Sequence, residues 1–313
     1  MTGSIVSLEE KPLAEQPVAK KPLTEQPALE KSDRPSFAQE LFRRPAGVFG
    51  LFIIVILIIL FIFGPLIAPY SASAQDIKHR LEPPSAEHLL GTDHLGRDVL
   101  SRLIIGTRVA LGVAFPAVFF ALVAGTILGL LAGYLGGWVD NALIVVTDSM
   151  QAFPSLMLAL ALLSLLEPSI QNLILVIAIS YTPGYARIVR AQVLAIREAQ
   201  YIEVERAFGA TDLRIALVHI LPNILAPLFI MLAMDLPTAI TTEAGLSFLG
   251  LGVRPPTPSW GVILNEGFQK IRISYWPVLG ASLTLMIATL GFTLFGETLR
   301  DILDPRLTGS RRV

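Results

Sequence analysis

The feature that most constrains this chain is an uncharged apolar block that runs from Val48 to Ala68. At about 1.5 Å of rise per helical residue, a helix of this length crosses the hydrocarbon core of a bilayer, which is roughly 30 Å thick. Charged residues make up only 16% of the chain, whereas soluble domains carry about a quarter. Five further apolar stretches follow, centred on residues 109–134, 142–166, 170–186, 221–243 and 276–297. We therefore expect an all-α membrane protein with six transmembrane helices.

Composition excludes several other classes of protein. The net charge of −1 supplies no basic field for nucleic acid. The chain has no cysteine, which excludes disulfides, cysteine nucleophiles and thiolate metal sites. A membrane-embedded enzyme would need a nucleophile with its base, or a set of His and carboxylate ligands, within the spans, and the sequence shows neither. We therefore expect no catalytic residues, no cofactor bound by this chain and no metal site.

The chain also divides by composition. Residues 1–40 are rich in Pro, Glu and Lys and contain a near-repeat that starts at Lys11 and again at Lys21. Such a segment cannot bury enough apolar surface to offset its chain entropy, so we predict a disordered tail. This leader and the apolar block are both too long for a signal peptide. After the tail we predict a first transmembrane helix over 41–70, an extracytoplasmic loop over 71–107, a five-helix membrane domain over 108–300 and a second tail over 301–313.

The placement of Lys and Arg predicts the orientation. Six spans put both termini on the same side of the membrane. If that side is the cytoplasm, sixteen of the 24 Lys and Arg residues lie inside and eight lie outside. Arg34, Arg43 and Arg44 are close to the first span, where charge matters most. We therefore expect an N-in, C-in topology in which residues 1–40 and 301–313 are cytoplasmic.

A stripe of small side chains marks the second span. Small residues allow helices in lipid to approach closely, so the stripe predicts helix packing. We favour packing inside the subunit over contact with a partner subunit. The stripe recurs at every fourth position: Ala117, Ala121, Gly125, Gly129, Gly133 and Gly137.

The connection between the fourth and fifth spans carries the clearest functional signal. It runs from Arg187 to Pro222 and is too polar to cross the membrane. Within it we expect a short helix, which Gly209 can end in a left-handed conformation, and Thr211 can cap the helix that follows. One face of the short helix is apolar and comprises Tyr201, Val204 and Phe208. Such a helix, held along the cytoplasmic surface, is suited to insertion into a groove of a partner.

This connection resembles the cytoplasmic signature of ATP-binding cassette (ABC) importer permeases. In that signature Glu-Ala-Ala is followed by a Gly four residues beyond the second Ala, and then by Ile-x-Leu-Pro. Glu203 matches the Glu, Gly209 the Gly and Leu221-Pro222 the closing pair. Val204-Glu205 replaces the two alanines, and His219 replaces the isoleucine. The resemblance implies an ATPase-coupling set that comprises Glu203, Val204, Glu205, Arg206, Ala207, Gly209, Ala210, Leu221 and Pro222.

Over roughly residues 40 to 307 the chain is similar to the dipeptide, oligopeptide and nickel branch of that family, and specifically to its second permease. Several collinear motifs carry the resemblance. They are Gly91-Thr-Asp-His-Leu-Gly-Arg-Asp98 with Ser101-Arg102, Asp148-Ser-Met-Gln-Ala-Phe-Pro154, Glu243-Ala-Gly-Leu-Ser-Phe-Leu-Gly-Leu-Gly252, Pro255-Pro-Thr-Pro-Ser-Trp-Gly261 and Asp301-Ile-Leu-Asp-Pro-Arg306.

The resemblance implies one subunit of a multi-chain machine. It predicts the type I ABC importer transmembrane fold in the bacterial cytoplasmic membrane, with residues 201–209 as a coupling helix seated in a separate ATPase. Its partners would be a second permease, two ATPase subunits that bind ATP and Mg²⁺, and an extracytoplasmic solute-binding protein. Gly91 and Gly96 have the spacing of a phosphate-binding loop, but Arg97-Asp98 replaces its Lys-Ser/Thr, so the motor must be another chain.

The solute and the mode of transport leave alternatives open. We expect di- or oligopeptides or peptide-like solutes, with nickel or a metal chelate as the alternative within the family. A stand-alone secondary transporter is the alternative from another class, although the six spans show no evident inverted repeat. One loop could bind a metal through Glu87, His88, Asp93, His94 and Asp98. Their spacing is not specific, so we favour a structured turn whose carboxylates cap helices and pair with Arg97 or Arg102.

Three carboxylates lie within or beside the spans, where ionisable groups are costly and often functional. Asp148 is near the predicted cytoplasmic end, where water can solvate it or it can cap a helix. Asp235 is deeper and precedes Pro237, and it is equally suited to the translocation path or to structural pairing. The family resemblance favours gate or pore lining for Glu243, near the outer end.

Overall fold

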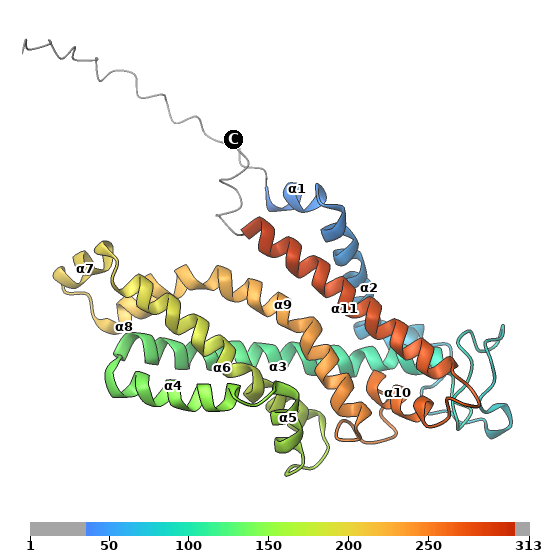
Figure 1. Cartoon of the computed structure of the whole chain (residues 1–313). Helices are drawn as coiled ribbons and strands as arrows, with labels where there is room; N and C mark the ends of the chain where they lie inside the picture. Colours follow the sequence, from blue (N-terminus) through green and yellow to red (C-terminus); the bar gives the residue numbers. More distant parts are fainter. Residues whose placement is uncertain (1–35, 304–313) are drawn as a thin grey trace, which may run out of the picture. The chain divides into compact units, whose positions relative to one another are not determined.

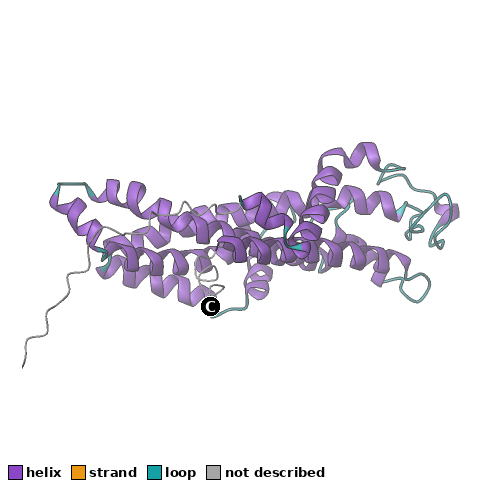
Figure 2. Ribbon diagram, turned by 90° about the horizontal axis from the view of Figure 1, so that it is seen from above, coloured by secondary structure: helices purple, strands orange, loops and turns teal. Residues whose placement is uncertain are grey.

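The computed structural model describes residues 36–303, and all of their regular elements are helical (Figure 1). In the same residues Figure 2 shows helices joined by loops and no strand. In chain order the elements are α1 (Phe37–Phe42), α2 (Pro45–Ile67), a 3₁₀ turn (Ile77–His79), α3 (Val99–Leu135), α4 (Gly137–Gln151), α5 (Ser155–Leu163), α6 (Ile170–Arg197), α7 (Gln200–Ala207), α8 (Asp212–Arg214), a π-helical turn (Ile215–Ile220), α9 (Leu221–Phe248), α10 (Trp260–Phe268) and α11 (Trp276–Leu303).

Five helical segments of the described chain are long and apolar enough to cross a membrane: α2, α3, α6, the stretch from Asp212 to Phe248, and α11. A sixth crossing arises if the pair of α4 and α5 counts as one bent span. The first span is confirmed, because α2 covers the predicted apolar block almost completely. The predicted tail over 1–40 lies outside the described residues except for its last five, of which four belong to α1. Most of the tail over 301–313 also lies outside them.

The predicted third span over residues 142–166 is not one continuous helix but the bent pair of α4 and α5. The chain bends by 89° between α4 and α5. The bend falls at Pro154, which precedes the first residue of α5. Proline disfavours the helical conformation in the residue before it, which here is Phe153, so the ladder of hydrogen bonds stops there. Because the chain is apolar on both sides of the bend, hydropathy alone does not reveal the break.

Two helices extend well beyond their apolar stretches. α3 starts at Val99, so the predicted loop over 71–107 ends at Asp98. The Asp98 carboxylate caps α3 by accepting a hydrogen bond from the Ser101 amide at 2.7 Å. α6 continues through Arg197 into the predicted polar connection, because neighbouring groups satisfy its basic side chains. Arg190 pairs with Asp140 of α4 at 2.5 and 2.7 Å.

α3 and α6 lie side by side along the stripe of small residues (Figure 1). A Cβ atom on Gly125 would lie 2.3 Å from the Cβ of Tyr185, and one on Gly129 would lie 2.6 Å from the Cβ of Val189. Gly133 faces Val193 in the same way, at 2.8 Å. These contacts are internal to the subunit. The last member of the predicted stripe, Gly137, is instead the first residue of α4, with a positive φ and nothing within 4 Å of a Cβ.

Contacts at the helix ends define two ends of the membrane domain. At the first, Arg44 before α2 pairs with Asp301 of α11 at 2.7 Å. We call the second end the α10 end. There the Trp260 indole donates a hydrogen bond to the Leu103 carbonyl at 3.0 Å. α11 also begins at this end. Since each crossing reverses direction, the first end also carries α7, and we call it the α7 end. The start of α2 and the end of α11 therefore lie on the same side.

Candidate functional site

The predicted coupling segment at the α7 end is confirmed as a short helix with an apolar exposed face. Tyr201, Val204 and Phe208 are 47%, 52% and 86% exposed. On the opposite side, Ile202 is completely buried and anchors α7 to the rest of the domain. A single anchored helix that exposes large apolar side chains in this way has the form of a ligand for a groove.

The helix ends as the sequence predicts. Gly209 has a φ of +83°, the left-handed conformation that favours glycine. Its amide donates to the Arg206 carbonyl at 2.9 Å, and the next amide, of Ala210, donates to the Glu205 carbonyl at 3.0 Å. The Thr211 hydroxyl then caps α8 by accepting from the Arg214 amide at 3.4 Å. Both expectations about Gly209 and Thr211 are confirmed.

The two positions that depart from the family signature lie beside each other. His219 Nε2 is 3.7 Å from a carboxylate oxygen of Glu205. The contact joins α7 to the π-helical turn that leads through Leu221 and Pro222 into α9. Ile215 and Ile220, at the two ends of that turn, are completely buried. The sequence shows both departures but not that the two side chains lie next to each other.

Polar grooves flank α7. Tyr134 of α3 donates a hydrogen bond to Asp212 at 2.6 Å, and Arg197 donates to the Gly133 and Tyr134 carbonyls at 3.1 Å. The Tyr134 bond joins α3 to α8, and the Arg197 bonds fix the end of α6 against the end of α3. The first groove holds about 420 Å³ and is lined by Tyr134, Leu135, Arg197, Glu198, Glu203, Arg206 and Asp212. The second holds about 450 Å³ and is lined by Glu205, Phe208, Gly209, Ala210, Thr211 and Arg214.

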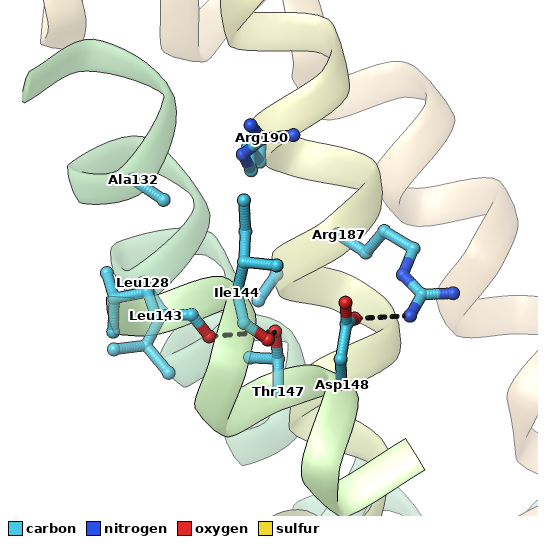
Figure 3. Close-up of a pocket in the computed structure, with 9 residues that line it drawn as sticks. Leu128, Ala132, Leu143, Ile144, Thr147, Asp148, Arg187 and Arg190 are labelled. Atoms are coloured by element: carbon cyan, nitrogen blue, oxygen red, sulfur yellow. Dashed lines mark hydrogen bonds and ion pairs between the residues drawn. The ribbon is translucent and has the colours of Figure 1, made fainter. Parts of the chain in front are cut away.

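A smaller pocket of about 230 Å³ lies between α3, α4 and α6 (Figure 3). On one wall Arg187 of α6 pairs with Asp148 of α4 at 2.6 Å, and both side chains are exposed. Asp148 is thus paired with a cation, in addition to the solvation that the sequence suggested. Leu128, Leu143 and Ile144 supply apolar walls.

The other two membrane carboxylates differ from each other. Asp235 lies midway along α9, half-buried, with no ion pair to any of residues 36–303. Glu243 is completely buried, and one of its oxygens accepts a hydrogen bond from the Ser247 hydroxyl at 2.7 Å. The carboxylate also interacts with Ser259, the residue before α10. Ser247 in turn packs tightly against Gly252 and Gly261, where a Cβ would collide with it. Glu243 therefore lies inside the junction of α9 and α10 in this conformation.

The loop that offered a possible metal site forms a structured turn. Asp93 pairs with Arg97 at 2.6 Å and with Arg102, and Glu266 of α10 pairs with the same two guanidiniums at 2.8 and 2.6 Å. Asp93, His94 and Glu266 do place potential ligand atoms within 4.8 Å of one another. A cation there would have to displace two arginines, so the geometry favours the ion cluster of Asp93, Arg97, Arg102 and Glu266. Sequence reasoning missed Glu266, which lies far away in the chain.

Two further members of that loop, His88 and Asp98, contact each other. His88 lies 2.9 Å from the carboxylate of Asp98, which caps α3 as described above. Gly96 shows how tightly the loop is folded: its φ is +75°, and a Cβ would lie 1.7 Å from the Asp76 carbonyl oxygen. The glycine spacing that resembles a phosphate-binding loop therefore serves a tight turn.

Comparisons with known sequences point to one family. The family described as the binding-protein-dependent transport system inner membrane component matches residues 125–309. The N-terminal transmembrane domain of oligopeptide transport permease C matches residues 36–84. The dipeptide transport system permease protein of Alkalihalophilus pseudofirmus is 41% identical over 274 residues, which cover 88% of this chain and 90% of the relative. The glutathione transport system permease protein of Escherichia coli O6:K15:H31 is 39% identical over 257 residues, 82% of this chain and 85% of the relative.

Proposed function

This chain belongs to the inner membrane components of binding-protein-dependent transport systems, and on that premise we propose that it forms half of a translocation path for di- or oligopeptides or peptide-like solutes. As a member of the family it is a permease subunit of an ABC importer in the bacterial inner membrane, and not an enzyme. Membership replaces the alternative of a stand-alone secondary transporter. The two relatives are named for a dipeptide and for glutathione, which favours a peptide-like solute over nickel or a metal chelate.

The partners of such a permease are an ATPase, another permease and a binding protein. In finer detail, we expect a heterodimer with a second permease, two ATPase subunits that carry ATP and Mg²⁺, and an extracytoplasmic solute-binding protein. This chain itself would bind no cofactor. Copurification from a membrane extract tests the composition: the ATPase and a second, different permease should accompany this chain, and recovery of the chain without either would contradict it.

The observation that best supports the coupling role is the exposure of Phe208 on an anchored segment. Phe208 projects beyond the domain, whereas Ile202, Ile215 and Ile220 hold the same segment rigidly in the core. Large aromatic side chains that become buried in a pocket dominate the energetics of many interfaces. A force applied to α7 by an ATPase would therefore pass through the π-helical turn into α9. In this arrangement the α7 end is cytoplasmic, which corresponds to the N-in, C-in topology.

The remaining site residues follow from the same arrangement. Glu203 and Arg206 line the first polar groove beside α7 and are suited to polar contacts at the rim of an ATPase cleft. Asp235 would face the translocation path. Glu243 would act at the outer gate by holding α10 against the end of α9, since its neighbour Ser247 packs directly on Gly261.

Substitution of the coupling segment tests the proposal. Gly209→Pro forces φ to about −65° in place of +83° and removes the amide bond to Arg206, and Glu203→Arg reverses a charge in the groove. Both variants should insert in the membrane but lose uptake and substrate-stimulated ATP hydrolysis by the complex. Normal stimulated hydrolysis in both would contradict the coupling role.

Gly250→Pro is the matched control. Gly250 has a φ of +81°, and its amide bonds to the Ser247 carbonyl at 3.1 Å, so the substitution causes a similar local loss at the α10 end. Copurification of the ATPase should fall in Gly209→Pro and remain in Gly250→Pro.

A further inference from the structure

Asp235 lacks a counter-ion where one is most needed. It lies fourteen residues from the first residue of α9 and thirteen from the last, so it is about 20 Å from either end at about 1.5 Å per residue. A carboxylate at that depth is costly unless it is paired or faces water. Within residues 36–303 no Lys, Arg or His pairs with it. Since the side chain is only half-buried, part of it reaches the surface of this subunit.

The nearest basic side chains on α6 are already engaged elsewhere. Arg187 turns towards α4, where it pairs with Asp148 (Figure 3). Arg190 pairs with Asp140, which also lies on α4. Neither pairs with Asp235, so a cation that did so would come from outside residues 36–303.

A buried tyrosine lies beside Asp235. Tyr185, at the middle of α6, is completely buried, and its hydroxyl interacts with the Asp235 carboxylate. The hydroxyl makes no other hydrogen bond within residues 36–303. Tyr185 therefore orients the carboxylate but brings no positive charge to it.

The two helices present matching polar faces around this pair. One turn from Tyr185, the Tyr181 hydroxyl lies 3.3 Å from the Thr242 hydroxyl of α9. Between the two tyrosines, a Cβ on Gly184 would meet only the end of Met231, at 3.6 Å. Tyr185 is completely buried here, whereas Tyr181 is only partly buried, and the polar face continues along α9 to the exposed Thr238.

We propose that Asp235, oriented by Tyr185, binds the primary ammonium group of the solute during its passage, a proposal that rests on the function proposed above. An N–H donor of the ammonium can pair with the half-buried Asp235 carboxylate, beside which the Tyr185 hydroxyl is buried. The aromatic face of Tyr181 adds a cation–π contact. The amino terminus of a free peptide is mainly protonated at neutral pH, since its pKa is about 7.7–8.0. The site thus selects solutes with a free amino terminus.

Thiol chemistry at Thr238 tests the site without any knowledge of the natural solute. The chain has no cysteine, so Thr238→Cys introduces its only thiol, on the turn next to Asp235. In the assembled importer in proteoliposomes, we would compare a trimethylammonium and a sulfonate methanethiosulfonate reagent, with labelling of the unsubstituted complex subtracted. The cationic reagent should react faster, and Asp235→Asn should lower the ratio of the two rates by about tenfold. Asp148→Asn, which removes an exposed and already paired carboxylate, should leave the ratio unchanged.

Protection by a peptide tests the class of ligand. Dialanine at millimolar concentration should slow the labelling of Thr238→Cys, and N-acetyl-dialanine should not. Equal protection by both, or by neither, would overturn the proposal. So would a thiol that neither reagent reaches, which would place a basic side chain of the second permease, or lipid, over Asp235. If Thr238→Cys does not assemble, Thr242→Cys on the same face replaces it.

The outcome is separable from that of the proposed function. Stimulation of ATP hydrolysis by the loaded binding protein reports on coupling through α7 and does not require Asp235. Stimulation retained together with an unchanged rate ratio in Asp235→Asn would overturn the ammonium site alone. Loss of stimulation in the unsubstituted complex would contradict the importer assignment.

Discussion

The two ends of the membrane domain differ in the groups that they bury and the groups that they expose. At the α10 end, charged groups are buried and paired within the chain: Asp93, Arg97, Arg102 and Glu266 form a closed cluster. At the α7 end, large apolar groups are left exposed, and Phe208 is the clearest case. The first end pairs its charged groups within this chain, whereas the second exposes an apolar surface that an ATPase would cover in the function proposed above. Substitutions at the α10 end should therefore affect folding, and substitutions at the α7 end should affect assembly.

The largest expected effect is on the stability of the α10 end. Asp93→Ala would leave two buried guanidiniums facing one carboxylate, and breaking a buried ion pair in this way costs about 3–5 kcal/mol. The purified permease complex should melt at a markedly lower temperature or fail to accumulate. Asp148→Ala breaks an exposed pair, which is worth about 0–1 kcal/mol, and serves as the control. Similar melting temperatures for the two variants would contradict the difference between the buried and the exposed ion pairs.

The next effect is on assembly at the α7 end. Phe208→Ala should leave the thermal stability of the permease unchanged, because the side chain is already exposed. The affinity for the ATPase should fall by tenfold or more, which corresponds to about 1.4 kcal/mol or more for an aromatic anchor. Titration of the ATPase onto the permease in detergent measures this loss. Phe42→Ala, another exposed phenylalanine, should leave the affinity unchanged.

The smallest expected effect comes from the contact between Glu205 and His219 at the α7 end. Glu205 and His219 are partly exposed, so their interaction should contribute no more than about 1 kcal/mol. His219→Ile alone leaves Glu205 without its neighbour, and Glu205→Ala alone leaves His219 without its own. A double-mutant cycle on substrate-stimulated ATP hydrolysis should show that the double variant is less impaired than the sum of the single variants. Strictly additive losses would mean that the two departures from the family signature arose independently.

The sequence predicted the parts of this molecule that depend on local patterns. Uncharged apolar runs predicted the long apolar helices, and the periodicity of Tyr201, Val204 and Phe208 predicted the exposed apolar face of the short helix α7. Hydropathy missed the polar extension of α6 to Arg197, because a helix continues wherever its polar side chains find partners on its neighbours. It missed the break before Pro154 for a related reason: both halves are apolar, and only their direction differs.

Pairings between distant segments were beyond reach without an alignment. Arg97 and Arg102 were expected to pair with carboxylates of their own loop, and Asp93 does so. Nothing local indicates that Glu266, on a helix that the sequence did not predict, completes the cluster. The proximity of Tyr185 and Asp235 depends in the same way on how α6 and α9 pack.

The π-helical turn between α8 and α9 constrains the number of residues that can connect these two helices. A π turn accommodates one more residue than an α-helical turn, and each residue of an α-helix rotates the chain by about 100°. The six residues from Ile215 to Ile220 thus fix the angular phase between α8, to which α7 is joined through residues 208–211, and the face of α9 that carries Asp235. Deletion of a single residue there would relax the turn to an α-helix and point α7 in a new direction. The number of residues in this turn is therefore under tighter constraint than the identity of most of them.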